Sequence, residues 1–319
     1  MKKMRILPLL AALSLLTACN KGPVVKAPTF TKEGDQVTYA EFQTKLEAAY
    51  KASELYDDGM GELPALGDRV EKGSYSSSHI ETVKRNKKEV RKEERAGSTS
   101  GEQLFDYDNL ASKVASNSKE TTSTKTEEVS SSSTSTGKSE TYYQFGKIDN
   151  EDYLLSVNPK TKSYRQYTSV SSDSTPAKTF DRFVRNSISN IQSLFTYYCP
   201  SESDAKDYVF ANRENLFTLS TSTEKSDSLL QGADKYADYK TSTKIKVQLD
   251  ISDGKQSLKL SYEVKTETTY TKAYPSYSQN FLKDDIYIEE IKEYYDISFA
   301  SKKADVKTVE ITEEYAYLN

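Results

Sequence analysis

The side chains that could do acid-base or nucleophilic chemistry are few in this sequence. His79 is its one histidine, so any mechanism that pairs a nucleophile with an imidazole base depends on a residue in a Ser-rich polar stretch. Zinc sites with two or three histidines are excluded, and two cysteines cannot supply a multi-thiolate site. We therefore expect no enzyme activity, no cofactor and no bound metal.

Short motifs do not change this expectation. Gly97–Gly101 has the outline of a nucleophile elbow, but its central residue is Thr99 and no apolar strand precedes it. Ser116 and Lys119 form one of several S-x-x-K pairs, without the companion motifs of penicillin-recognising enzymes. The carboxylate pairs Asp57-Asp58 and Asp106/Asp108 lack EF-hand spacing, which favours solvated acidic turns.

The N-terminus carries the most specific pattern. A basic segment, Met1 to Arg5, precedes an apolar run from Ile6 to Leu16 that is too short to cross a hydrocarbon core of about 30 Å. Leu16-Thr17-Ala18-Cys19 then resembles the lipobox of bacterial lipoproteins. The resemblance implies cleavage of residues 1–18 as a signal peptide and attachment of acyl chains to Cys19. The alternative is an ordinary secretory signal with Cys19 incidental.

Residues 19–37 are expected to form the lipidated cysteine and a flexible tether, because Gly22, Pro23, Pro28 and Gly34 disfavour regular structure. At full stretch such a tether spans on the order of 50 Å. The expected location is the extracytoplasmic face of the cell membrane, held there by the lipid anchor. If the host has two membranes, Asn20 is compatible with delivery to the outer one.

Composition bounds the partners. The chain has 319 residues, a net charge of −4 and 48 acidic against 44 basic side chains, which argues against nucleic acid as a partner. Its 35% hydrophobic residues, with 24 Tyr, are enough for a core, so residues 38–319 are expected to form one β-rich domain. Cys199 then has no disulfide partner within the chain. A small buried hydrophobe is the favoured role for Cys199 and covalent dimerisation the alternative, so the oligomeric state stays open.

Two amphipathic helices are predicted. Thr38 and Glu41 form a capping box in front of a helix over 39–56, and Pro176 suits the first turn of a second helix that reaches Tyr198. The second helix has the strongest apolar stripe of the chain. This stripe consists of Phe180, Phe183, Val184, Ile188, Ile191, Leu194, Phe195 and Tyr198.

Most of the remainder alternates like β-strands. The strands are expected at 142–148, 153–157, 164–170, 243–251, 256–270, 286–299 and 306–317, and Asp253-Gly254 is a hairpin signal between two of them. The Ser/Thr-rich tract at 119–139 has little to bury and is expected to be a mobile loop, with an exposed edge strand as the alternative. The charged stretch 84–95 is expected to be a solvated face, with an anion-binding patch as the alternative.

The order of these elements behind a lipobox resembles LolA-like and LppX-like lipoproteins. The resemblance implies an α+β, β-dominated fold: a curved, half-barrel-like antiparallel sheet with two amphipathic helices packed on one face. It also implies an apolar cavity for acyl chains, with Phe180, Phe183, Val184, Ile188, Ile191, Leu194 and Phe195 as candidate wall residues. The expected function is that of a non-catalytic surface lipoprotein that binds a hydrophobic or amphiphilic ligand or a partner protein. A structural or adhesive lipoprotein without a cavity, and the solute-binding lipoprotein of a transporter, are the alternatives.

Overall fold

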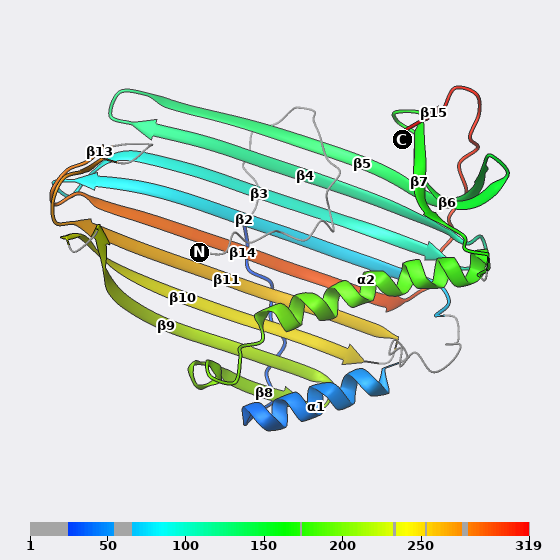
Figure 1. The fold of residues 1–319 in the computed structure, drawn as a ribbon, viewed down its shortest axis with the longest axis horizontal. Helices are drawn as coiled ribbons and strands as arrows, with labels where there is room; N and C mark the ends of the chain where they lie inside the picture. The colour runs from blue at the N-terminus through cyan, green and yellow to red at the C-terminus, as the bar shows by residue number, and fades with distance from the viewer. Residues whose placement is uncertain are drawn as a thin grey trace.

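A computed structural model describes residues 25–53, 66–172, 174–231, 234–252, 254–275 and 280–318. The described residues form one large, curved, unclosed sheet and two helices (Figure 1). Neighbouring strands are antiparallel except β7 and β15. The order across the sheet is β1 (Asp35–Val37), β8 (Val209–Arg213), β9 (Leu216–Gln231), β10 (Asp234–Ser252), β11 (Lys255–Tyr270), β14 (Ile286–Ser301), β2 (Arg69–Arg85), β3 (Lys88–Asp106), β4 (Ala111–Thr126), β5 (Ser130–Ile148), β6 (Glu151–Asn158), β7 (Ser163–Ser169) and β15 (Ala316–Tyr317).

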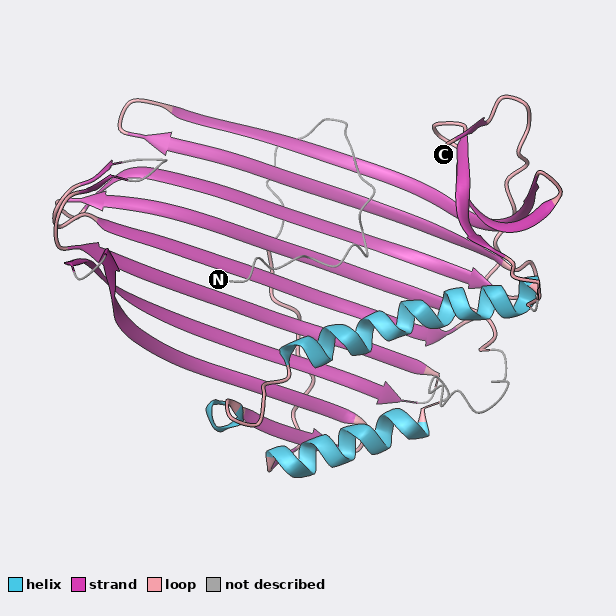
Figure 2. Cartoon of the chain, viewed as in Figure 1, coloured by secondary structure: helices cyan, strands magenta, loops and turns pink. Residues whose placement is uncertain are grey.

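The helices begin where their caps predict. Helix α1 (Tyr39–Ala52) starts after Thr38, whose side chain accepts a hydrogen bond from the Glu41 backbone N–H. The Glu41 side chain in turn accepts one from the Thr38 backbone N–H. Helix α2 (Pro176–Tyr198) starts after Thr175, whose hydroxyl accepts from the backbone N–H of Lys178. Figure 2 shows both helices on the same side of the sheet, over one end of its strands. The predicted helix over 39–56 is shorter at its C-terminus, because the helix ends at Ala52.

One apolar core joins the two helices to the sheet. Phe42 of α1 packs against Phe195 of α2 and against Phe210 and Phe217 of β8 and β9, with ring centroids 5.0 to 6.3 Å apart. All four rings are almost fully buried. Burying one such side chain contributes about 1.5–3 kcal/mol, so this cluster of rings contributes strongly to the stability of the fold.

A smaller apolar cluster lies at the other end of the strands. Val83, Ala237 and Tyr270 form it together with Phe281 of the short hairpin β12 (Tyr274–Pro275) and β13 (Asn280–Phe281). The rings of Tyr270 and Phe281 stack with centroids 4.1 Å apart. The two apolar clusters therefore lie at opposite ends of the strands.

The segment before β1 crosses the opposite face of the sheet. Val247 and Leu249 point into the core, so the alternating side chain of Gln248 points the other way. Gln248 accepts a hydrogen bond from the Thr31 backbone N–H and donates one to the Thr31 carbonyl, at 2.8 and 3.0 Å. Lys259 donates to the Thr29 carbonyl at 2.6 Å. The prediction of a free tether is therefore wrong for residues 25–37, because side chains of the sheet form hydrogen bonds with the backbone of this segment.

The Ser/Thr-rich tract at 119–139 is not a loop. It forms the hairpin of β4 and β5, which are paired residue by residue from Lys125↔Ser130 to Ser112↔Tyr143. Cross-strand hydroxyl pairs add to the backbone ladder, with Ser116 and Ser139 2.9 Å apart and Thr121 and Thr134 3.1 Å apart. The loop was predicted because the tract has few apolar side chains to bury. The tract is a strand pair instead, because β4 pairs with the backbone of β3 and threonine favours strands.

The expected strands are otherwise confirmed except the last. The meander appears as β5, β6 and β7, the hairpin as β10 and β11, and 286–299 as β14. Residues 302–314 contain no regular strand, and only β15 remains of the strand expected at 306–317. Backbone groups of residues 302–314 bond to side chains instead. The Val306 N–H donates to Asp106, the Val309 N–H donates to the Gln144 side chain, and that side chain donates to the Val309 carbonyl.

Candidate functional site

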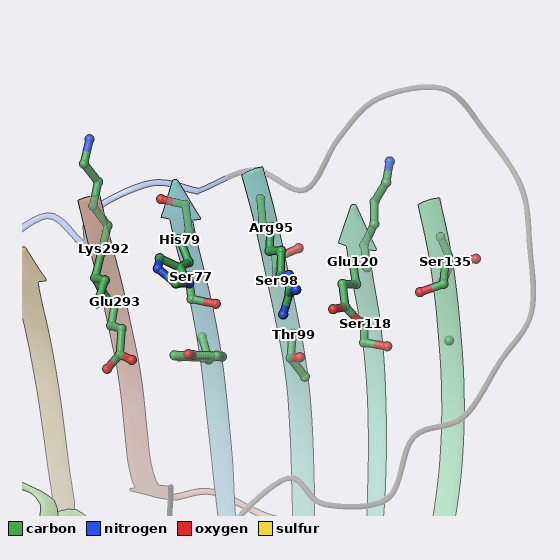
Figure 3. A pocket seen from close by; sticks show the side chains of 18 residues that line it. Ser77, His79, Arg95, Ser98, Thr99, Ser118, Glu120, Ser135, Lys292 and Glu293 are labelled. Carbon is green, nitrogen blue, oxygen red and sulfur yellow. The ribbon is translucent and has the colours of Figure 1, made fainter. Parts of the chain in front are cut away.

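A shallow polar groove of about 520 Å³ crosses five neighbouring strands (Figure 3). Its lining comes from β14, β2, β3, β4 and β5, in that spatial order. Small residues leave it hollow, among them Ser77, Gly97, Ser118 and Gly137. The groove arises because strand pairing stacks these small residues beside one another in a region that neither helix covers.

Charged side chains of both signs line this groove. Arg95 supplies a positive charge, and Glu120 and Glu293 supply negative ones. Burial raises the pKa of the Glu293 carboxyl above its usual range. A lining of mixed charges and hydroxyls suits a polar partner and offers no apolar enclosure for an acyl chain.

His79 and two glutamates form a cluster at the edge of the groove. The His79 Nε2 atom lies 2.9 Å from Glu289 Oε1 and 3.6 Å from Glu81 Oε1. His79 and Glu81 are two apart on β2 and so share a face, and the register places Glu289 of β14 directly opposite Glu81. All three side chains are 35–39% exposed.

Tyrosines form a half-buried patch beside the groove, near the C-terminal end of α2. The rings of Tyr75 and Tyr295 lie 4.6 Å apart, and those of Tyr198 and Tyr262 lie 6.2 Å apart. Burial, and after it the charge of Glu293, raises the pKa of the Tyr198 hydroxyl. The patch joins the apolar core to the polar groove.

One edge of the sheet is open over a long distance. Strand β6 pairs with β5 only from Tyr142 to Ile148, so in the described part of the chain Ser130–Thr141 pairs with β4 alone. The backbone N–H of Thr126 donates to the Val129 carbonyl at the turn. In an antiparallel ladder the direction of the N–H groups alternates, so the N–H groups of even-numbered residues such as Ser132 point outward.

The candidate cavity wall on α2 is packed against the sheet. Phe180, Val184 and Phe195 are fully buried, Ile191 is 1% and Phe183 7% exposed, and Leu194 packs on the same core. The ring of Phe183 lies 5.0 Å from that of Tyr143 and 5.9 Å from that of Phe105. The groove contains none of these residues. The side chain of Ile188 lies outside the described part of the structure.

The remaining predicted residues lie apart from the groove or outside the described residues. Cys19, the signal peptide and the carboxylates Asp57 and Asp58 lie outside the described residues. Asp106 is buried and accepts from the backbone N–H groups of Asn109 and Val306, which gives this carboxylate a structural role. Cys199 caps α2, and burial raises the pKa of its thiol to about 11, so it is a poor nucleophile at neutral pH.

Sequence reasoning found His79 but not its neighbours. The His79/Glu81 spacing was visible in the alternation of β2, whereas Glu289 is 210 residues away from His79 in sequence. Its position depends on β14 inserting between β11 and β2, which no local pattern specifies. The open edge of β5 agrees with the alternative for the tract at 119–139, an exposed edge strand, and not with the mobile loop that was favoured.

Comparisons with known proteins add little. No protein-family model matches the chain, and no curated protein matches it. The crystal structure of Pseudomonas aeruginosa OccK7 (OpdD) is similar over 73% of this chain and 98% of that one, at 9% identity and a TM-score of 0.17. A TM-score this low carries no argument. Neither described helix is long and apolar enough to span a membrane.

Proposed function

We propose that this protein is a membrane-anchored surface lipoprotein that acts without catalysis and binds a partner protein through the open edge of its sheet. The observation that carries the proposal is the edge of β5 over Ser130–Thr141, which has no second neighbour among the described strands. An unpaired strand edge presents a row of N–H and C=O groups that can pair with an added strand.

The chemistry of this edge favours specific pairing over aggregation. Residues 130–137 are serine, threonine and glycine, so the edge offers hydrogen bonds without an apolar surface. Lys138 and Glu140 then add charge, which discourages pairing with identical edges. Before Phe105, β3 has no buried residue, so this half of the sheet is a broad hydrophilic surface beside the edge.

The anchoring part of the proposal rests on the lipobox-like segment that ends at Cys19. The half-barrel form of the sheet and the packing of both helices on one of its faces belong to the same proposal, as does the extracytoplasmic location. The packed stripe of α2 supports a partner-binding surface more than an internal acyl carrier, because Phe180 and Phe195 contact other core side chains.

Anchoring is tested by following the N-terminus of the natively produced protein. We expect mass spectrometry to find a mature chain that begins with acylated Cys19 and fractionates with membranes. The C19A variant should lose the acyl label and leave the membrane fraction. A mature N-terminus at any other residue contradicts the proposal.

Partner binding is tested by photocrosslinking in the native host, with a photoreactive residue at Thr134. We expect a defined adduct that disappears in S132P, because proline removes an outward N–H donor and is tolerated on an edge strand. S132A is the matched control and should retain the adduct, because it keeps the N–H. An adduct of equal yield in both variants contradicts strand addition.

The tyrosine patch favours one second candidate, the binding of an amphiphile. Tyr75, Tyr295 and Tyr262 present half-buried rings next to the charged groove, so they could contact an apolar tail near a polar headgroup. Mass spectrometry of organic extracts distinguishes the two candidates. A stoichiometric lipid beyond the covalent anchor, reduced in Y295S, would support the amphiphile and count against the protein partner.

A further inference from the structure

His79, Glu81 and Glu289 have the composition and spacing of a divalent-metal site. One imidazole nitrogen and two carboxylates point to the same place, and the three potential ligand atoms all lie within 4.8 Å of one another. We propose that these residues bind one zinc ion on this face of the sheet. The site does not depend on the proposed partner-binding function.

The distances fit a shared ion. Zinc binds imidazole nitrogen and carboxylate oxygen at about 2.0–2.2 Å, so two ligand atoms of a tetrahedral site lie about 3.3 Å apart. The separations of His79 Nε2 from Glu289 and from Glu81, 2.9 and 3.6 Å, lie on either side of this value. Small rotations of the two half-exposed glutamates therefore suffice to close the site.

The sheet positions all three ligands before any metal arrives. His79 and Glu81 project from the same face of β2, and Glu289 is held opposite Glu81 by the β2–β14 ladder. Two glutamates directly opposite each other repel, which is unfavourable in a sheet unless a cation lies between them. A zinc ion supplies more positive charge at that point than a protonated imidazole does.

Polar and charged side chains surround the cluster. Tyr287 is two residues from Glu289 on β14 and so lies on the same face, beside the cluster. The exposed side chain of Arg95 lies opposite His79 in the register. Glu93 lies opposite Glu81 and is ion-paired with Arg91, so the charge of Glu93 is already balanced.

The ligand set selects among metals. Ca²⁺ and Mg²⁺ prefer all-oxygen sites with more ligands, whereas imidazole with carboxylate suits zinc. Three protein ligands leave a fourth position, and the exposure of all three side chains opens that position to water. The site thus resembles an open zinc site in coordination, with no reaction implied.

The single histidine makes the test direct. The full chain, purified in detergent with a tag that contains no histidine, is labelled with ¹⁵N-histidine and titrated with zinc chloride at about pH 7.5. We expect the imidazole signals of His79 to shift and to saturate at one equivalent of zinc, with calorimetry giving one site. Calcium and magnesium chloride at about 1 mM should leave these signals unshifted.

Isosteric variants assign the carboxylates. E81Q and E289Q should each weaken zinc binding about 10-fold or more, and H79Q should abolish the stoichiometric site. E290Q is the matched control, because it removes the same charge from the next residue of β14 on the other face, where Glu290 pairs with Lys265. E290Q should change the affinity less than about 2-fold. Far-UV circular dichroism verifies that each variant folds.

Two results would overturn the assignment. One is an imidazole signal that stays in place at an excess of zinc, which would leave His79 as an ordinary ion-pair partner of the glutamates. The other is a zinc affinity that is the same in wild type, H79Q and E289Q, which would place the bound ion elsewhere.

Discussion

Glu71 is expected to make the stability of this protein fall as the pH rises. It is 9% exposed and lies on β2 between Phe299 and Gln103 of the neighbouring strands. Burial raises the pKa of its carboxyl from 4.5 to about 7. Between these two values the folded protein keeps a proton that the unfolded chain has already lost, so stability decreases with pH across this window and levels off above it.

The size of the effect follows from the pKa difference. At 1.36 kcal/mol per unit, a rise from 4.5 to about 7 corresponds to about 3 kcal/mol. The isosteric variant E71Q cannot ionise, so we expect it to match wild type below pH 4.5 and to exceed it by about 3 kcal/mol above pH 7. In thermal unfolding this gain corresponds to roughly 6 °C.

Urea unfolding at a series of pH values measures this difference. The chain has 24 tyrosines and no tryptophan, so tyrosine fluorescence reports the transition. E267Q is the control, because Glu267 is exposed on β11 and its replacement should change stability by less than about 0.5 kcal/mol at every pH. A difference between E71Q and wild type that stays constant with pH would refute the reasoning.

Three further predictions follow from the packing. F180A should cost about 3–5 kcal/mol in urea unfolding, because Phe180 is fully buried, whereas L230A at a 60% exposed position should cost less than about 0.5 kcal/mol. G34A should destabilise the edge by about 1–3 kcal/mol and speed amide exchange in β1, since an added Cβ would lie 2.1 Å from a backbone oxygen of β8. D106A should make the segment around Val306 sensitive to trypsin, because the Asp106 carboxylate accepts the Val306 N–H; unchanged cleavage rates would contradict that role.

Local chemistry was enough to predict the helices and most of the strands. The capping box at Thr38 and Glu41 and the proline at the start of α2 are signals within one helical turn, and both helices begin there. Turns were similarly readable: Asp149 and Asn150 both adopt positive φ, which these residue types tolerate in a tight hairpin.

What failed depends on pairing between distant segments. The Ser/Thr-rich tract lacks an apolar face, so its sequence does not reveal that β3 provides a template for β4. Residues 302–314 alternate like a strand, yet Asp106 and Gln144 satisfy their backbone groups without a ladder. The His79 cluster needed the position of β14 in the sheet, which is a property of topology.

Because residues 25–34 cross the face of the sheet opposite the helices, the tether between the folded domain and the bilayer is short. If Cys19 bears the anchor, only five residues lie between it and Val25, and the contour length from Cys19 to Val25 is at most about 20 Å. A body held so closely cannot tumble freely. The face of the sheet without helices would then face the lipid, while α1, α2 and the histidine cluster would face away from the membrane.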